Sequence, residues 1–262
     1  MTRRCHILSF LLAMVIAPQA LAHAQAAPFR WHGAVAPGAA VEIKGVNGNV
    51  VAGRADGHEV EVVAEKRARR SDPESVTIEV VPHGDGVTIC AVYPNGDGGR
   101  ANECAPGEGG RMNVRDNDVT VDFTVKVPPG VRFIGRTVNG DVEAQQIGAA
   151  VSLKTVNGSV TFSTSASGDA STVNGSIRGN LGRTDWADTL EFNTVNGSVV
   201  LTLPNDVNTD VKAQTANGDI STDFPLTVTG RWSRRRLEGT IGGGGRMLSI
   251  ETVNGGITLK RP

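Results

Sequence analysis

The sequence has 262 residues, with 26 Lys and Arg against 27 Asp and Glu, and a formal net charge of −1. A charge this close to zero excludes a generally basic nucleic-acid-binding protein. Glycine is frequent, at 33 residues, whereas aromatic residues make up only 4%. This composition is typical of a chain with many turns and a thin core.

Residues 1–24 indicate an export signal. Arg3 and Arg4 form a positive start, a mostly apolar run follows, and small residues surround a cleavage position after Ala24. A second cleavage position follows Ala26, and an uncleaved membrane anchor is the alternative. Loss of Arg3 and Arg4 leaves 24 basic against 27 acidic residues, a net charge of −3. No later run reaches the ~20 apolar residues of a spanning helix, so no transmembrane segment is expected after signal removal.

Residues 25–130 predict a series of short β-strands. Val119–Val127 alternates apolar and polar residues until "PPG" ends the run, and the same alternation marks "VEIKGVNGNVV", "HEVEVVAE", "SVTIEVV" and "GVTICAVY". We interpret these segments as diverged coils that are continuous with the repeat that follows. A separate small β-sandwich over residues 28–128 is the alternative.

Cys90 and Cys104 are the only cysteines left after signal removal. An exported chain enters an oxidising compartment, where two cysteines indicate one disulfide. The segment between them is rich in turn residues and has little to bury, so closing this loop should stabilise the fold by roughly 3 kcal/mol. The spacing matches neither a Cys-x-x-Cys redox motif nor a zinc motif.

Residues 131–262 contain a repeated turn, "TVNG", with one "TANG" variant, and an earlier copy, "GVNG", precedes them. The Asn residues of the later copies are Asn139, Asn157, Asn174, Asn196, Asn217 and Asn254. Their intervals are 18, 17, 22, 21 and 37 residues. Because the last interval is about twice the others, we expect the degenerate copy Leu237–Ile241 to form an intervening layer.

Two structures would explain Asn-Gly between alternating strands. Asn-Gly is the preferred pair of a tight β-hairpin turn, and it also suits the corner of a solenoid, where the chain bends sharply. We favour the solenoid because Thr, Val and a β-branched residue recur with Asn-Gly, and stacked coils place identical residues above one another. The predicted fold is all-β: a single-stranded, β-helix-like solenoid with coils of about 16–22 residues and Asn-Gly corners.

In such a solenoid the Asn residues from Asn139 to Asn254 should form one hydrogen-bonded column, with layers ~4.8 Å apart. A layer without Asn, near Glu238, is expected between Asn217 and Asn254. Asn254 would then end the column. An interior residue such as Asn174 should therefore tolerate substitution less well than Asn254.

Several segments together resemble the bacterial putative adhesin family over essentially the whole mature chain. They are the export signal, "FRWHGAV", "ICAVYP" with its second cysteine, "VPPGV", the serial "TVNG" copies, "DFPLTV" and "GTIGGGG". The resemblance implies an exported β-solenoid of unknown function in the periplasm or at the cell surface. It implies no catalytic residue, because the family offers no catalytic motif to match.

No residue pattern indicates catalysis, a cofactor or a metal. The residue after Asn-Gly is Ser in three copies and Asp, Asn or Gly in the others, so a role in the turn is expected for Ser159, Ser176 and Ser198. The acids of "RDNDVTVD" fit no calcium motif, and "GTIGGGGR" lacks the ending of a phosphate-binding loop, so a flexible or bulged connection is expected. The spacing of His32, His58 and His83 does not match that of metal ligands either.

Two basic clusters are candidate anion-binding sites, because Arg offers forked donors to phosphate and carboxylate groups. The first cluster, "EKRARR", contains Lys66, Arg67, Arg69 and Arg70. The second, "RWSRRR", contains Trp232 and the candidate anion-binding residues Arg231, Arg234, Arg235 and Arg236. A solvated edge that blocks strand pairing is the alternative interpretation of both.

We therefore expect a non-enzymatic exported scaffold, in the periplasm or at the cell surface, that presents a regular β surface to an anionic envelope polymer or an envelope protein. One alternative is a polysaccharide-acting β-helix enzyme, which would need a groove with two carboxylates roughly 5 to 9.5 Å apart. The other is an architectural or envelope-stress module, which the sequence does not separate from the scaffold.

Overall fold

The computed structural model describes residues 24–25, 27–95, 100–183, 186 and 188–262, the last with residues 229–232 described for their backbone only. The predicted signal peptide lies almost wholly outside the described residues. Nearly every regular element in the described part is a β-strand, and the one helical turn there is the short 3₁₀ helix η1 (Pro73–Ser75).

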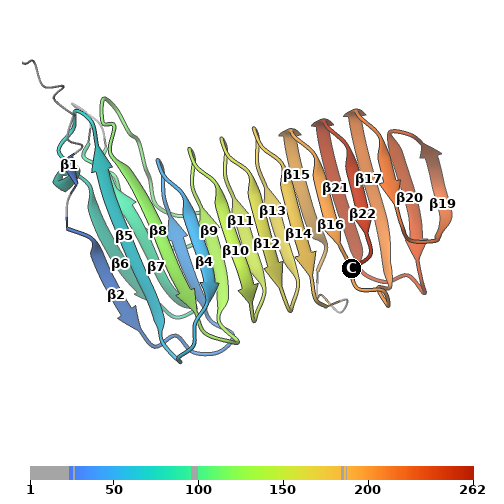
Figure 1. Cartoon of the computed structure of the whole chain (residues 1–262), viewed down its shortest axis with the longest axis horizontal. Coiled ribbons are helices and arrows are strands. Elements are labelled where there is room, and N and C mark those ends of the chain that lie inside the picture. The colour runs from blue at the N-terminus through green and yellow to red at the C-terminus, as the bar shows by residue number, and fades with distance from the viewer. Residues whose placement is uncertain (1–23, 26, 96–99, 184–185, 187) are drawn as a thin grey trace, which may run out of the picture.

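The strands form two sheets of 11 strands each, which face one another along the length of the molecule (Figure 1). In spatial order the first sheet contains β1 (Ala24–Gln25), β5 (Val60–Ala68), β8 (Thr120–Val127), β4 (Val50–Arg54), β10 (Val142–Ile147), β12 (Val160–Thr164), β14 (Ile177–Leu181), β16 (Val199–Thr202), β22 (Ile257–Lys260) and β18 (Ile220–Thr222), with β2 (Phe29–Gly33) paired to β5. The second contains β19 (Leu226–Ser233), β20 (Arg236–Ile241), β17 (Thr209–Asn217), β21 (Met247–Asn254), β15 (Leu190–Asn196), β13 (Gly168–Ser171), β11 (Val151–Lys154), β9 (Arg132–Arg136), β3 (Ala40–Lys44), β7 (Gly86–Val92) and β6 (Thr77–His83).

The repeat builds coils that alternate between the two sheets. Each of the strands β9, β11, β13 and β15 lies in the second sheet and is followed, after an Asn-Gly corner, by a strand of the first sheet. Equivalent strands of neighbouring coils pair in parallel, and they are in register except for one shift in β10 between Ala144 and Ile147. The two strands that flank a corner therefore lie in different sheets, which excludes the hairpin interpretation of the Asn-Gly turns.

The fold is all-β and solenoid-like, as the sequence predicts, but it is not a single-stranded solenoid throughout. Both sheets are mixed, because antiparallel strands cover the N-terminal end of the parallel stack in both sheets and its C-terminal end in the second sheet. At the N-terminal end β5 pairs with β8 and β6 pairs with β7, and at the C-terminal end β20 pairs with β17 and β19. Such end strands satisfy the backbone groups that the last parallel coil would leave exposed.

The N-terminal region shares both sheets with the repeat. β3 pairs in parallel with β9, and β4 pairs in parallel with β10. The strands between β4 and β9 extend the two sheets beyond this coil. Its corner, at Asn47, stands directly beside the corner at Asn139.

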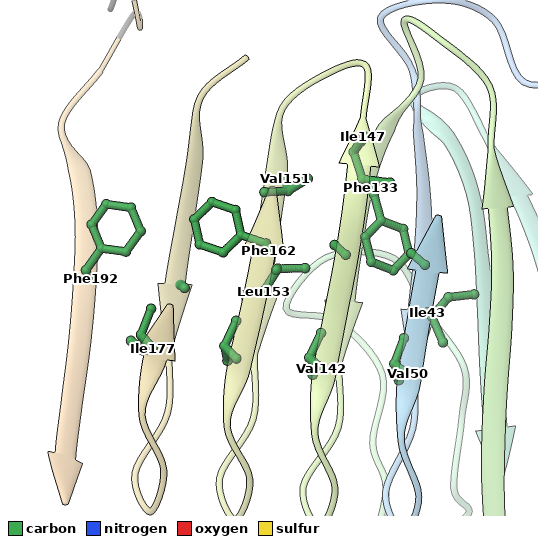
Figure 2. Packing of buried hydrophobic residues seen from close by; sticks show 14 of the residues in the cluster. Ile43, Val50, Phe133, Val142, Ile147, Val151, Leu153, Phe162, Ile177 and Phe192 are labelled. Carbon is green, nitrogen blue, oxygen red and sulfur yellow. The ribbon is translucent and has the colours of Figure 1, made fainter. Parts of the chain in front are cut away.

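The core is a layer of apolar side chains between the sheets (Figure 2). Phe162 of the first sheet and Phe192 of the second stack with their ring centroids 6.2 Å apart. The first inward position of successive strands in the first sheet is β-branched and fully buried in Val50, Val142, Val160, Ile177, Val199 and Ile257. Full burial of one such side chain contributes roughly 1.5–3 kcal/mol, so stacking of the coils is itself the main source of stability.

The C-terminal coil lies out of chain order. β21 pairs in parallel with β15 on one side and β17 on the other, and β22 lies in the same way between β16 and β18. The chain therefore leaves β16, passes over one layer to form β17 and β18, and returns to fill that layer with its last strands. Figure 1 shows β21 between β15 and β17.

The expectation of a layer near Glu238 between Asn217 and Asn254 is wrong. Leu237–Ile241 lies in β20, which pairs antiparallel with the far side of β17. The reason is that β20 is one arm of a hairpin with β19. A hairpin arm reverses the chain direction and cannot form a layer of a parallel stack.

The predicted disulfide is confirmed, since Cys90 and Cys104 are bonded with their Cα atoms 5.8 Å apart. The segment after Cys104 lies against Lys44 of β3. The Lys44 ammonium donates hydrogen bonds of 2.5, 2.6 and 3.0 Å to the carbonyl oxygens of Ala105, Gly107 and Gly109. Burial, through loss of water around the ammonium, lowers the pKa of Lys44.

Candidate interaction surface along the Asn-Gly edge

Seven Asn-Gly corners follow one another along one long edge of the molecule, where the second sheet passes into the first. We call this the Asn-Gly edge. In spatial order it consists of residues 45–48, 137–140, 155–158, 172–175, 194–197, 252–255 and 215–218. Three columns of side-chain hydrogen bonds and one column of exposed apolar side chains run along it.

The first column is formed by buried threonine hydroxyls. Thr172 is 5% exposed, and its hydroxyl donates a 2.8 Å hydrogen bond to the carbonyl oxygen of Gly158 in the preceding coil. The same bond, of 2.8 to 2.9 Å, is made by Thr137, Thr155, Thr194, Thr215 and Thr252. Thr and Gly have the same spacing in each of these turns, and the hydrogen bond between them joins each coil to its neighbour.

The second column is an amide ladder. The side-chain N–H of Asn174 donates to the side-chain oxygen of Asn157, and Asn196 donates to Asn174, each at 2.8 Å. The order along the ladder is Asn47, Asn139, Asn157, Asn174, Asn196, Asn254 and Asn217, with 2.8 Å at every step. All six residues that the sequence places in one column lie in it, but Asn254 is an interior member and Asn217 ends the ladder.

The third column is formed by the residue after Asn-Gly. The side-chain oxygen of Asp141 accepts a 2.7 Å hydrogen bond from the backbone N–H of Ser159. Ser159 and Ser176 accept in turn from the backbone N–H of the next coil, at 3.3 and 3.2 Å. These serines therefore bridge coils and have no geometry of an activated nucleophile. The sequence indicates their place in the turn, but the contact across coils is visible only in the structure.

The apolar column consists of the valines of the repeat, which point to solvent. Val138, Val156, Val173 and Val195 are 38 to 39% exposed and Val253 is 44% exposed, at the same position of successive coils. Val46 and Ala216 take the equivalent places in the first and last coils. The repeat predicts that these valines lie above one another, but it does not predict their exposure, which the hydrogen-bonded corner imposes.

A shallow depression of about 450 Å³ lies beside this column on the outer face of the second sheet. Val173, Val195 and Val253 form its apolar side, and Ser171, Asn193, Gln214 and Glu251 are among the polar residues that line it. These side chains come from neighbouring strands in register. The depression is thus an open strip with one apolar and one polar side.

A second depression, of about 300 Å³, shares Ser171 and Asn193 with the first and contains two carboxylates. Asp169 and Glu191 lie one strand apart on β13 and β15. Burial raises the pKa of Asp169, against the effect of its 2.8 Å hydrogen bond from the Ser152 hydroxyl. The sequence does not predict this pair. The two residues stand 22 positions apart, in parts of the coils that differ from one repeat to the next.

Residues 132–260 match the Toastrack DUF4097 family. This segment is a Toastrack domain. A solved structure of a putative cell adhesion protein from Clostridium sporogenes is 12% identical over 90% of this chain and all of its own, with a TM-score of 0.46. A putative adhesin from Bacteroides fragilis is 12% identical over 90% of this chain and 97% of its own, with a TM-score of 0.35. No curated protein matches the chain.

The basic cluster at the C-terminal end of the Toastrack domain stands at one end of the Asn-Gly edge. Arg234 and Arg235 are exposed at the turn between β19 and β20, and the carbonyl oxygen of Arg235 accepts the backbone N–H of Thr215. Arg236 is held 2.9 Å from the Glu238 carboxylate. The side chain of Arg231 lies outside the described part of the structure. Two of the four predicted arginines are thus placed together at the edge.

The other basic cluster stands at the opposite end, before the Toastrack domain begins. A depression of about 650 Å³ is lined there by Arg67–Arg70, Asp118 and Thr120. Arg67 pairs with Asp122, and Lys66 lies 2.8 Å from the Glu74 carboxylate. Hydrogen bonds from the backbone and hydroxyl of Ser71 lower the pKa of Asp118 to about 2. This cluster is therefore largely neutralised by its own acids.

The remaining candidates serve structural contacts. His83 lies 3.1 Å from the Thr88 hydroxyl, and His32 lies 3.3 Å from the Glu59 carboxylate. Within the described residues no three His, Cys, Asp or Glu side chains come together as a metal site would require. Among the same described residues, no helix is long and apolar enough to cross a membrane. Gly242–Gly245 connects β20 to β21.

Proposed function

We propose that the chain is a non-enzymatic, adhesin-like scaffold that presents its Asn-Gly edge to a cell-envelope component or an envelope protein. The observation that supports this most directly is the valine column, held at nearly constant exposure by the three hydrogen-bonded columns. Apolar side chains at this regularity and exposure are costly to leave in water unless a partner covers them. Rigid positioning also lowers the entropy that a partner loses on binding.

The valine column is large enough to matter for affinity. Each valine keeps about two fifths of its residue surface exposed, and full burial of a valine contributes roughly 1.5 kcal/mol, so covering one contributes about 0.6 kcal/mol. Five valines together would contribute about 3 kcal/mol, which corresponds to roughly 100-fold in affinity.

The exposed Arg234 and Arg235 extend the proposed surface toward anionic partners, such as an acidic envelope polymer. Guanidinium groups bind phosphate and carboxylate through paired hydrogen bonds, and exposed ion pairs weaken as salt rises. Binding through this end of the edge should therefore fall with increasing ionic strength, whereas binding to the valine column should change little.

The chain is further proposed to act outside the cytoplasm. The predicted export signal and the bonded Cys90–Cys104 pair both support this, because disulfides form and persist in oxidising compartments. We propose the periplasm or the cell surface as the location of the mature protein.

Co-sedimentation with isolated envelope fragments would test the proposed function. The triple substitution Val156→Ser, Val173→Ser and Val195→Ser removes the centre of the column and should weaken binding about 20-fold, from about 0.6 kcal/mol per valine. A matched control is Val51→Ser, because Val51 is 40% exposed on β4 away from the edge. Equal binding of the triple variant and the wild type would refute the role of the edge.

One observation favours a second candidate, an enzyme that acts on polysaccharide. Asp169 has a raised pKa and Glu191 lies on the next strand of the same depression, as an acid and a nucleophile would in a retaining glycosidase. Release of reducing ends from envelope glycans, lost in Asp169→Asn, would support that candidate. If the wild type releases no reducing ends, the enzyme candidate is refuted and the scaffold function is the one that remains.

A further inference from the structure

The C-terminal coil lies in a slot between two walls of the solenoid. β15 and β16 form one wall, and β17 and β18 form the other. The chain passes from wall to wall through residues 203–208, where Leu203 and Val207 are buried. The strands of both walls precede the coil in the sequence.

The connection to this coil is unusually free to change conformation. Gly242, Gly244 and Gly245 have positive φ values of 60°, 73° and 154°, which glycine adopts without strain in either a turn or an extended chain. The turn is closed by few contacts, including a 2.6 Å hydrogen bond from Gly243 N–H to the Asn208 side chain. Opened, residues 242–246 span up to about 17 Å.

The slot recognises the coil through features that belong to the repeat itself. Asn254 donates to Asn196 and accepts from Asn217, each at 2.8 Å. The Thr252 hydroxyl donates to the carbonyl oxygen of Gly197 at 2.9 Å. Deeper in the slot the coil buries Leu248, Ile250, Ile257 and Leu259 completely. A segment that lacks Thr, Asn and these apolar residues in this register would leave the columns broken, so the fitting occupant is a coil of this same sequence.

We propose that two copies of this chain exchange their C-terminal coils, so that residues 246–260 of each copy fill the slot of the other. The exchanged coil makes the same contacts as in the single chain, and only the glycine connection changes. Exchange of an identical element in this way is a low-cost route to a symmetric dimer.

Protein concentration decides between the two forms. A tether of five residues gives the coil of the same chain an effective concentration on the order of millimolar at its own slot. The single-chain form is therefore favoured in dilute solution, and the exchanged dimer forms when chains fold close together. The ratio of dimer to monomer should rise about tenfold for each tenfold increase in concentration during refolding.

Mixed cross-linking of residues 25–262, which lack Cys5 and contain no cysteine besides the bonded Cys90 and Cys104, would detect the exchange. Lys212 and Ser249 are partners in register on β17 and β21, and both side chains are half-exposed. A tagged Lys212→Cys chain and an untagged Ser249→Cys chain are unfolded together in acidic denaturant, where thiol–disulfide exchange is suppressed. They are then refolded and treated with a short bis-maleimide. The expected product is a covalent heterodimer whose yield rises with concentration.

A matched control uses Lys154→Cys and Ser171→Cys, which are partners in register on β11 and β13. These strands lie in mid-chain and cannot exchange, so this mixture should give only background heterodimer. A yield in the Lys212→Cys and Ser249→Cys mixture no higher than this background would overturn the proposal.

Deletion of Gly243 and Gly244 gives an independent measurement. The shortened connection is strained when it passes over β17 within one chain, and a short, strained hinge loop favours exchange between copies. The deletion variant should therefore elute at twice the monomer mass at concentrations where the wild type is monomeric. A folded, monomeric deletion variant would refute the exchange, and if the variant does not fold, the cross-linking result decides.

Discussion

Replacement of single residues in the amide ladder should reveal the order of the coils in solution. In Asn174→Ala two side-chain hydrogen bonds of 2.8 Å are lost, one to Asn157 and one from Asn196. Each contributes about 0.5–1.5 kcal/mol net, and the low end applies because the ladder is exposed and water replaces part of the loss. The expected decrease in the free energy of unfolding is therefore about 1 kcal/mol.

Position in the ladder makes the prediction specific. Asn254 also makes two ladder bonds, because the C-terminal coil lies between two others, whereas Asn217 makes one. We therefore expect Asn254→Ala to cost about as much as Asn174→Ala, and Asn217→Ala about half as much. This reverses the expectation from chain order, in which Asn254 ends the column.

Urea unfolding followed by circular dichroism would measure these changes, with the midpoint compared at constant slope. Asn180→Ala is a matched control, since Asn180 is an exposed residue of β14 outside the ladder and should change stability by less than about 0.5 kcal/mol. If Asn254→Ala is milder than Asn217→Ala, the intercalated order of the last coils is wrong.

Three further predictions follow from single contacts. Gly175→Ala should destabilise the fold more than any single ladder substitution, measured by the same urea unfolding, because the new Cβ would overlap the carbonyl oxygen of Gly158; an unchanged midpoint would contradict this. Cys90→Ser should lower stability by roughly 3 kcal/mol, and the unreduced wild type should resist alkylation at both cysteines. Because hydrogen bonds lower the pKa of Asp118 to about 2, its stabilising effect should be complete above pH 4 and disappear as pH falls toward 2. Asp118→Asn should remove that acid-dependent part of the unfolding curve, and an identical pH profile in this variant would be the contrary result.

The sequence by itself determines the local unit of this fold. A β-strand, a Thr-Val-Asn-Gly corner and a second strand follow from the alternation of apolar residues and from the small residues at the turn. Stacking of identical units then predicts the column that contains Asn174 and the interior row that contains Val160. These features depend on contacts between equivalent residues, so they can be inferred from the repeat alone.

Only the tertiary structure decides which coil lies beside which. Every corner from residue 137 onward presents the same Thr, Asn and Gly groups, so the edge of one of these coils accepts another almost equally well, and the local sequence carries no order. The hairpin of β19 and β20 occupies the far side of β17, which leaves the last coil only the layer beside β15. The pairing of Asp169 with Glu191 across neighbouring strands has the same origin, because residues between the corners meet only after the coils have been ordered.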